Sequence, residues 1–237
     1  MVIEFIILLL IAYLLGSVPA AYLATRWSRG IDIRQYGSGN VGASNVLRFT
    51  SKRVGIPVIV FDIGKGMAAV WAAQFVGLGS LQQVLIGLAV ISGHNWPVFL
   101  RFKGGRGILT TLGVILMLAP WLALIMAIIA FSFAPFHQLA PGVLLAMLSA
   151  PVLAWFLSPP LVSADRTPVT LGLVAMSLIV AFRRLAVPRS SLASSVTRGE
   201  LFFNRLLFDR DIRNREPWIN HILPEADQPA GQKDRIE

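Results

Sequence analysis

The chain has 237 residues, of which 55% are hydrophobic and 14% are charged. A soluble domain carries roughly a quarter charged residues, so this composition excludes a soluble globular enzyme, and a disordered chain needs the opposite balance. Cysteine is absent, which excludes disulfides, thiolate zinc sites and a cysteine nucleophile. The net charge is +9, and in a hydrophobic chain this indicates basic loops beside an anionic membrane face rather than binding of nucleic acid.

Apolar stretches predict an all-α integral membrane protein. Each is long enough to cross a hydrocarbon core of about 30 Å, and they cover residues 2–23, 54–78, 80–100, 108–134, 139–157 and 168–182. The first is not a cleaved signal peptide, because no basic region precedes it and its apolar run is too long.

Basic residues predict the orientation. Nearly all lie in 24–53, in 101–107 and in the tail from Arg183 onward, so the positive-inside rule puts these segments and the C-terminus in the cytoplasm and the N-terminus outside.

An even number of crossings must then separate 101–107 from the tail. We therefore split 108–134 at Ala119-Pro120, where proline breaks a helix, into 108–118 and 120–136, which gives seven transmembrane helices. The first of the two is a short, half-depth helix, tolerated only when buried in protein or beside a polar cavity. A cavity is thus expected near 104–118.

A glycine-rich segment at 31–48 is the first candidate anion site. Its glycines allow successive backbone N–H groups to converge on an anion, while serine, asparagine and arginine add donors. The plainer interpretation is a flexible loop. The candidate residues are Gly37, Ser38, Gly39, Asn40, Gly42, Ser44, Asn45 and Arg48.

A second candidate lies at 93–107, where Lys103 and Arg106 bracket Gly104-Gly105. Glycines let a phosphate approach the backbone and the cations neutralise it. The segment is no Walker A loop, so an NTPase is disfavoured. The alternative for this segment is an ordinary basic loop, and His94, at a membrane end, is either catalytic or structural.

Asp62 and Lys65 lie three residues apart on one face of the second span. Buried ions in a membrane helix are costly and often functional, so this pair is either part of a substrate site or a neutralised structural pair. Two basic, glycine-rich segments on one membrane face suggest two phosphorylated groups, one of them on a lipid.

These residues resemble the bacterial acyl-phosphate-dependent glycerol-3-phosphate acyltransferase family. The resemblance covers roughly residues 1–135 and rests on GSVP, GIDIR, GSGNVGASN, DIGKG and GHNWPVFLRFKGGRG. Serine replaces the family's usual threonine at position 44, and Arg106 replaces its usual lysine.

The resemblance implies transfer of a fatty acyl group from acyl phosphate to the 1-hydroxyl of glycerol 3-phosphate in the bacterial inner membrane, with the site facing the cytoplasm. It implies Ser38, Arg48, His94, Lys103 and Arg106 as catalytic residues and the other residues named above as substrate-binding. No metal or cofactor is expected. The partners would be the two substrates, membrane lipids and an enzyme that makes acyl phosphate, without nucleic acid.

The second half departs from this family. Its Ser-Leu-x-Ser motif corresponds here to residues 141–144, without hydroxyls, and its last motif to 183–189, where histidine and asparagine are replaced. Two alternatives therefore stay open: a catalytically impaired relative that binds a phospholipid intermediate, and an organic-anion or phosphate transporter.

The tail adds a separate region. We divide the chain into a membrane domain at 1–189 and a cytoplasmic tail at 190–237. Phe202, Phe203, Leu206 and Leu207 recur among arginines and predict an interfacial amphipathic helix, followed by a disordered end.

Overall fold

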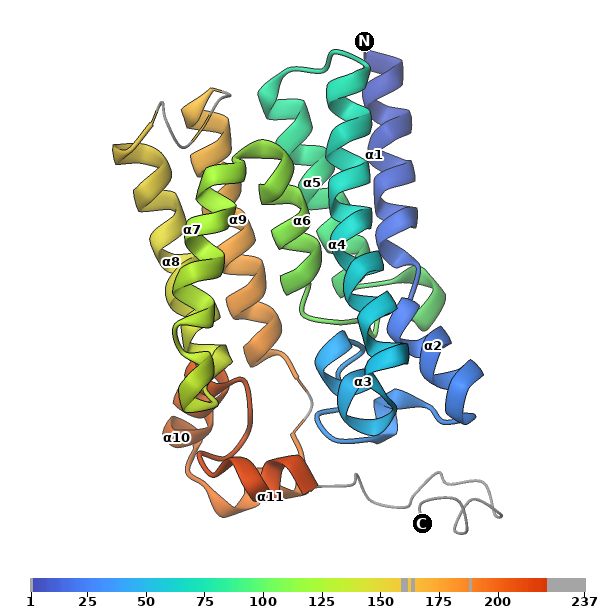
Figure 1. Ribbon diagram of the computed structural model, residues 1–237, viewed down its shortest axis with the longest axis vertical. Coiled ribbons are helices and arrows are strands. Elements are labelled where there is room, and N and C mark those ends of the chain that lie inside the picture. Colours follow the sequence, from blue (N-terminus) through green and yellow to red (C-terminus); the bar gives the residue numbers. More distant parts are fainter. Residues whose placement is uncertain (1, 159–161, 163–164, 188, 221–237) are drawn as a thin grey trace.

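A computed structural model describes residues 2–158, 162, 165–187 and 189–220. The predicted disordered end of the tail lies outside this part of the chain. The described residues form a helical bundle (Figure 1), which confirms the predicted all-α class.

The long helices are α1 (Val2–Ser17), α4 (Lys52–Phe75), α5 (Ser80–Asn95), α8 (Leu139–Phe156) and α9 (Arg166–Leu185). Two shorter apolar helices are α6 (Ile108–Leu118) and α7 (Pro120–Phe131). Within the described residues, five helical stretches are long and apolar enough to cross a membrane: Val2–Arg29, Lys52–Phe75, Ser80–Leu100, Leu139–Phe156 and Arg166–Leu185.

The predicted break at Ala119-Pro120 is confirmed. Ala119 ends α6 and Pro120 is the first residue of α7, where the missing N–H of proline costs nothing. Helix α6 is short, as expected, and it packs in the middle of the bundle against α4, α5, α7 and α9.

Glycines let the helices of the bundle approach at backbone distance. A side chain at Gly16 of α1 would meet the carbonyl of Val90 on α5, and one at Gly93 would meet the carbonyl of Tyr13. Gly113 of α6 similarly faces the carbonyl of Ile63 on α4. Such small-residue contacts are the usual means of packing helices in a membrane, where burial of apolar surface supplies little drive.

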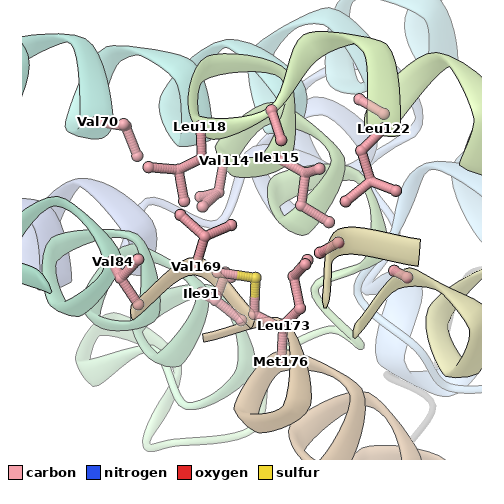
Figure 2. Packing of buried hydrophobic residues seen from close by; sticks show 14 of the residues in the cluster. Val70, Val84, Ile91, Val114, Ile115, Leu118, Leu122, Val169, Leu173 and Met176 are labelled. Atoms are coloured by element: carbon pink, nitrogen blue, oxygen red, sulfur yellow. The ribbon is translucent and has the colours of Figure 1, made fainter. Parts of the chain in front are cut away.

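Apolar side chains fill the space between α4, α5, α6, α7 and α9. Figure 2 shows them pointing toward one another: Val70, Val84, Ile91, Val114, Ile115, Leu118, Leu122, Val169, Leu173 and Met176. This core holds the half-length helix α6 in place.

Short elements gather at the end of the bundle away from the N-terminus (Figure 1). They are α2 (Ala20–Arg29), η1 (Ile33–Gln35), α3 (Ala43–Phe49), η4 (Ser191–Ser195), α10 (Arg198–Phe203), η5 (Asn204–Phe208) and α11 (Arg215–Asn220). The remaining turns are η2 (Val98–Leu100) and η3 (Ala134–Phe136). All three basic segments reach this end.

The tail is more than a separate surface helix. A capping box of Thr197 and Glu200 begins α10, and the chain then passes into a π-helical turn, η5, which contacts α8 and α9. Phe202 and Phe203 are exposed, whereas Arg205 is buried. The exposed phenylalanines and the buried Arg205 thus lie on different sides of this segment, and the buried side packs against the bundle.

Candidate active site

The first glycine-rich loop is built around Asn45. The buried side-chain amide of Asn45 donates hydrogen bonds to the carbonyls of Ile33, Tyr36 and Asn40, at 3.3, 2.9 and 3.2 Å. Gly37 and Gly39 have φ of +56° and +64°, which glycine adopts without strain. The loop thus has a defined set of internal hydrogen bonds that centre on Asn45.

Helix α3 carries the next candidates. Ser44 and Arg48 are one turn apart, so they share a face, and both are exposed to an open cavity that Ser38 also lines. Burial and the nearby charge of Arg215 lower the pKa of Arg48. An anion between these two cations would relieve their repulsion.

The second glycine-rich loop is clamped from two sides. Gly105 N–H donates to the carbonyl of His94, at 3.1 Å. Arg183, at the end of α9, donates to the carbonyls of Gly104 and Gly105, at 2.9 and 3.0 Å. A side chain on Gly105 would collide with the His94 ring, so the path of this loop requires glycine.

The two cations of this loop differ in placement. Lys103 is exposed and does not line the open cavity, whereas Arg106 is 8% exposed and does line it. The structure therefore brings Arg106, and not Lys103, to the cavity that Arg48 lines.

Asp62, Lys65 and His94 form a buried cluster behind the loop. The ammonium of Lys65 lies 2.8 Å from a carboxylate oxygen of Asp62, 2.8 Å from Nδ1 of His94 and 3.2 Å from the carbonyl of Gly16. The cluster borders a void of about 10 Å³, also lined by Gly104. It joins α1, α4 and α5 beneath the glycine loop and contributes nothing to the wall of the open cavity.

The open cavity has a volume of about 460 Å³ and is strongly basic. Of the predicted residues, Ser38, Ser44, Asn45, Arg48 and Arg106 line it. Gly37, Gly39, Asn40, Gly42, Gly104 and Gly105 shape the two loops without lining it. The lining residues that sequence reasoning missed are Leu47 on α3 and a group from the second half: His137, Gln138, Leu139, Ala140, Pro141, Phe208, Asp209, Arg210, Arg215 and Trp218.

Arg184 joins the start of α8 to the tail. Its guanidinium, 1% exposed, donates to the carbonyls of Ala140 and Leu206, at 2.9 and 2.8 Å. Pro141 begins the segment that lacks the family's hydroxyls, and it lines the cavity, as does Gln138. Polar groups at this wall thus come from the residues just before α8.

Asp209 brings a carboxylate into the cavity. It forms an ion pair with Arg106, with 2.6 Å between carboxylate oxygen and Nε. Burial raises the pKa of the Asp209 carboxyl, although Arg106 and Arg184 act in the opposite direction. Asp209 lies in the run NRLLFDRD at 204–211. No pattern of charge or helical period in the sequence connects this run to the loop at 101–107.

The site is a basic cavity at one end of a membrane-type helical bundle, with arginines from three separate segments. The sequence model for glycerol-3-phosphate acyltransferase matches residues 6–189. The chain therefore belongs to the glycerol-3-phosphate acyltransferase family.

Curated relatives agree. Glycerol-3-phosphate acyltransferase 4 of Dehalococcoides mccartyi strain CBDB1 is 49% identical over 216 residues, which is 91% of this chain and 93% of the relative. Glycerol-3-phosphate acyltransferase 5 of Dehalococcoides mccartyi strain ATCC BAA-2266 / KCTC 15142 / 195 is 46% identical and covers 94% of this chain and 96% of the relative. The enzyme of Laribacter hongkongensis is 46% identical over 64% of this chain and 78% of its own length.

Solved structures show the same fold. Crystal structures of PlsY (YgiH), an integral membrane glycerol 3-phosphate acyltransferase, in a lysophosphatidic acid form and a glycerol 3-phosphate form each have a TM-score of 0.67 and 30% identity to this chain. They align with 76% of this chain and with 87% and 88% of their own. The chain is thus an acyltransferase and a multi-pass membrane protein.

Proposed function

We propose that this protein transfers a fatty acyl group from acyl phosphate to the 1-hydroxyl of glycerol 3-phosphate, giving lysophosphatidic acid and phosphate. The observation that carries the proposal is the meeting of Ser38 and Arg48 with Arg106 at one cavity of about 460 Å³. A cavity of this size suits a polar phosphorylated substrate, and arginines supply forked donors for phosphate oxygens. The glycerol 3-phosphate form of a related structure supports the acceptor.

The chemistry needs positioning more than a nucleophile. The hydroxyl oxygen of glycerol 3-phosphate attacks the acyl carbonyl carbon, a new ester C–O bond forms, and the bond from that carbon to the phosphate oxygen breaks. The hydroxyl proton passes to a phosphate oxygen. Arg48 and Arg106 hold the phosphates and stabilise the charge on the leaving group, and Ser38 orients them.

His94 and Lys103 take indirect roles in this proposal. His94 supports the loop that carries Arg106, because its carbonyl accepts the hydrogen bond from Gly105 and its ring faces that glycine. Lys103, exposed on the same loop, attracts the anionic substrates to the cavity mouth. Asp62 and Lys65 in turn position His94, because both contact Nδ1 of its ring.

We further propose that the chain crosses the bacterial inner membrane seven times, with the cavity end in the cytoplasm. The uneven distribution of Lys and Arg supports this orientation, and the break at Ala119 supports counting α6 and α7 separately. The exposed Phe202, Phe203 and Leu207 then lie at the cytoplasmic membrane surface. An enzyme that makes acyl phosphate supplies the donor.

The test uses purified protein in detergent with palmitoyl phosphate and glycerol 3-phosphate, and it measures released phosphate and lysophosphatidic acid. Arg48→Ala should remove turnover, whereas Arg53→Ala, an exposed arginine at the start of α4, should not. Absence of turnover in folded wild-type protein would overturn the proposal in favour of an impaired relative. Uptake of labelled glycerol 3-phosphate into liposomes without acyl transfer would indicate a transporter.

A further inference from the structure

The C-terminal segment reaches the cavity although the family match ends at residue 189. Of the described residues that line the cavity, Asp209 is the one acid. It follows the π-helical turn η5 and has a φ of +59°. A non-glycine residue pays for this left-handed conformation, so the surrounding contacts must hold it there.

Those contacts tie the segment to the end of α9. Arg205, 7% exposed, pairs with Asp211 at 2.7 Å and donates to the carbonyls of Leu185 and Val187, at 3.0 and 2.6 Å. Asp211 also accepts hydrogen bonds from the backbone and hydroxyl of Ser190, at 2.8 and 2.7 Å. Buried charged groups paired in this way fix one geometry, because any other leaves a charge unpaired.

Asp209 contacts the edge of the Arg106 guanidinium that carries Nε and Nη2. The carboxylate meets Nε, and the carbonyl of Asp209 lies 3.5 Å from Nη2. The contact at Nε is an ion pair without hydrogen-bond geometry, because neither Nε nor Oδ1 of Asp209 has a hydrogen-bond partner among the described residues. An arginine can hold one anion at Nε and still present its terminal nitrogens to a second, which the single ammonium of a lysine cannot do in the same geometry.

We propose that Asp209 is a positioning residue for acyl transfer: it holds the Arg106 guanidinium by its Nε side so that the terminal nitrogens face the phosphate of glycerol 3-phosphate. The C-terminal segment is then part of the active site. This inference rests on the function proposed above and adds a residue to it.

The test compares Asp209→Ala and Arg106→Lys, alone and combined, in the purified enzyme with saturating palmitoyl phosphate. Asp209→Ala should lower kcat/KM for glycerol 3-phosphate about tenfold or more, mainly through KM, because the buried guanidinium of Arg106 loses its ion-pair partner. In the Arg106→Lys background, which lacks Nε, the same change should have an effect of about twofold or less. Glu200→Gln, at an exposed carboxylate of the same segment, should match wild type.

Asp211→Asn separates positioning from mere folding of the segment. It loosens the pair with Arg205 and should lower activity equally in the wild-type background and in the Arg106→Lys background.

The proposal is overturned if Asp209→Ala also lowers activity equally in both backgrounds, or if it leaves kcat/KM unchanged. It is overturned as well if Asp209→Ala lowers KM, which would make Asp209 a competitor of the substrate phosphate. A wild-type enzyme without turnover would overturn the proposed function, whereas an active wild type with an unaffected Asp209→Ala variant would overturn this inference alone.

Discussion

The ammonium of Lys65 lies 2.8 Å from Nδ1 of His94, deep in the bundle and directly beneath the glycine loop. Lys65 belongs to α4 and His94 to α5. The ring of His94 faces Gly105, in the loop that carries Arg106. A buried charged cluster thus supports the glycine loop from the side of the helices.

Asp62→Asn should destabilise the protein strongly. The Asp62 and Lys65 side chains are 3% and 1% exposed, and removing one member of a buried pair costs about 3–5 kcal/mol because the other charge is left without a partner. The double variant Asp62→Leu with Lys65→Met should cost clearly less than Asp62→Asn. Thermal unfolding in detergent measures both, and equal losses would show that the pair acts only through packing.

Gly105→Ala should lower kcat/KM by roughly 100-fold, since a shift of about 1 Å in a group that positions substrate can have an effect of that size. The added methyl group would collide with the His94 ring, so the loop and Arg106 must move. Gly64→Ala is the matched control, because a side chain at this position of α4 meets nothing within 4 Å. Activity retained in both variants would contradict the role of the loop.

The sequence predicted the membrane bundle and the break at Ala119 because these depend on local properties, namely apolar runs and a proline. It also predicted Ser38, Arg48 and Arg106, whose glycine-rich surroundings are recognisable within a few residues. The meeting of Asp209 with Arg106 depends instead on how the chain folds after α9. Charge pattern and helical period in the tail indicated a surface helix and carried no signal for its buried face.

Two arginines at the end of α9 make backbone contacts in the part of the chain that departs from the family pattern. Arg183 stands where the resemblance implies histidine, and it holds the glycine loop by two carbonyls. Arg184 holds Ala140 and Leu206 together. Both contacts are made to backbone atoms, which a comparison of side-chain motifs does not reveal.

The contribution of Asp209 should disappear in acid. Burial raises the pKa of this carboxyl above its ordinary value of 3.8, against the opposing charges of Arg106 and Arg184. Below that pKa the group is neutral and binds Arg106 no better than an amide does. The ratio of kcat/KM between wild type and Asp209→Asn should therefore be largest at neutral pH and approach one as the pH falls through the raised pKa. Because the substrate phosphates titrate equally in both enzymes, they cancel in the ratio; a ratio independent of pH would contradict the ionised pair.

Removal of residues 198–237 should abolish acyl transfer. The truncation takes away Asp209, Arg210 and Arg215 from the cavity wall, and it leaves Arg184, 1% exposed, without the carbonyl of Leu206. A buried arginine that loses an acceptor is costly, so the end of α9 should loosen and release the glycine loop that Arg183 holds. Truncation after Asn220 keeps every described residue of the cavity and should leave kcat/KM within about twofold of wild type, as is usual away from such features. If the protein that lacks residues 198–237 still transfers acyl groups, with a KM for glycerol 3-phosphate like that of wild type, then this segment covers the cavity without taking part in the reaction.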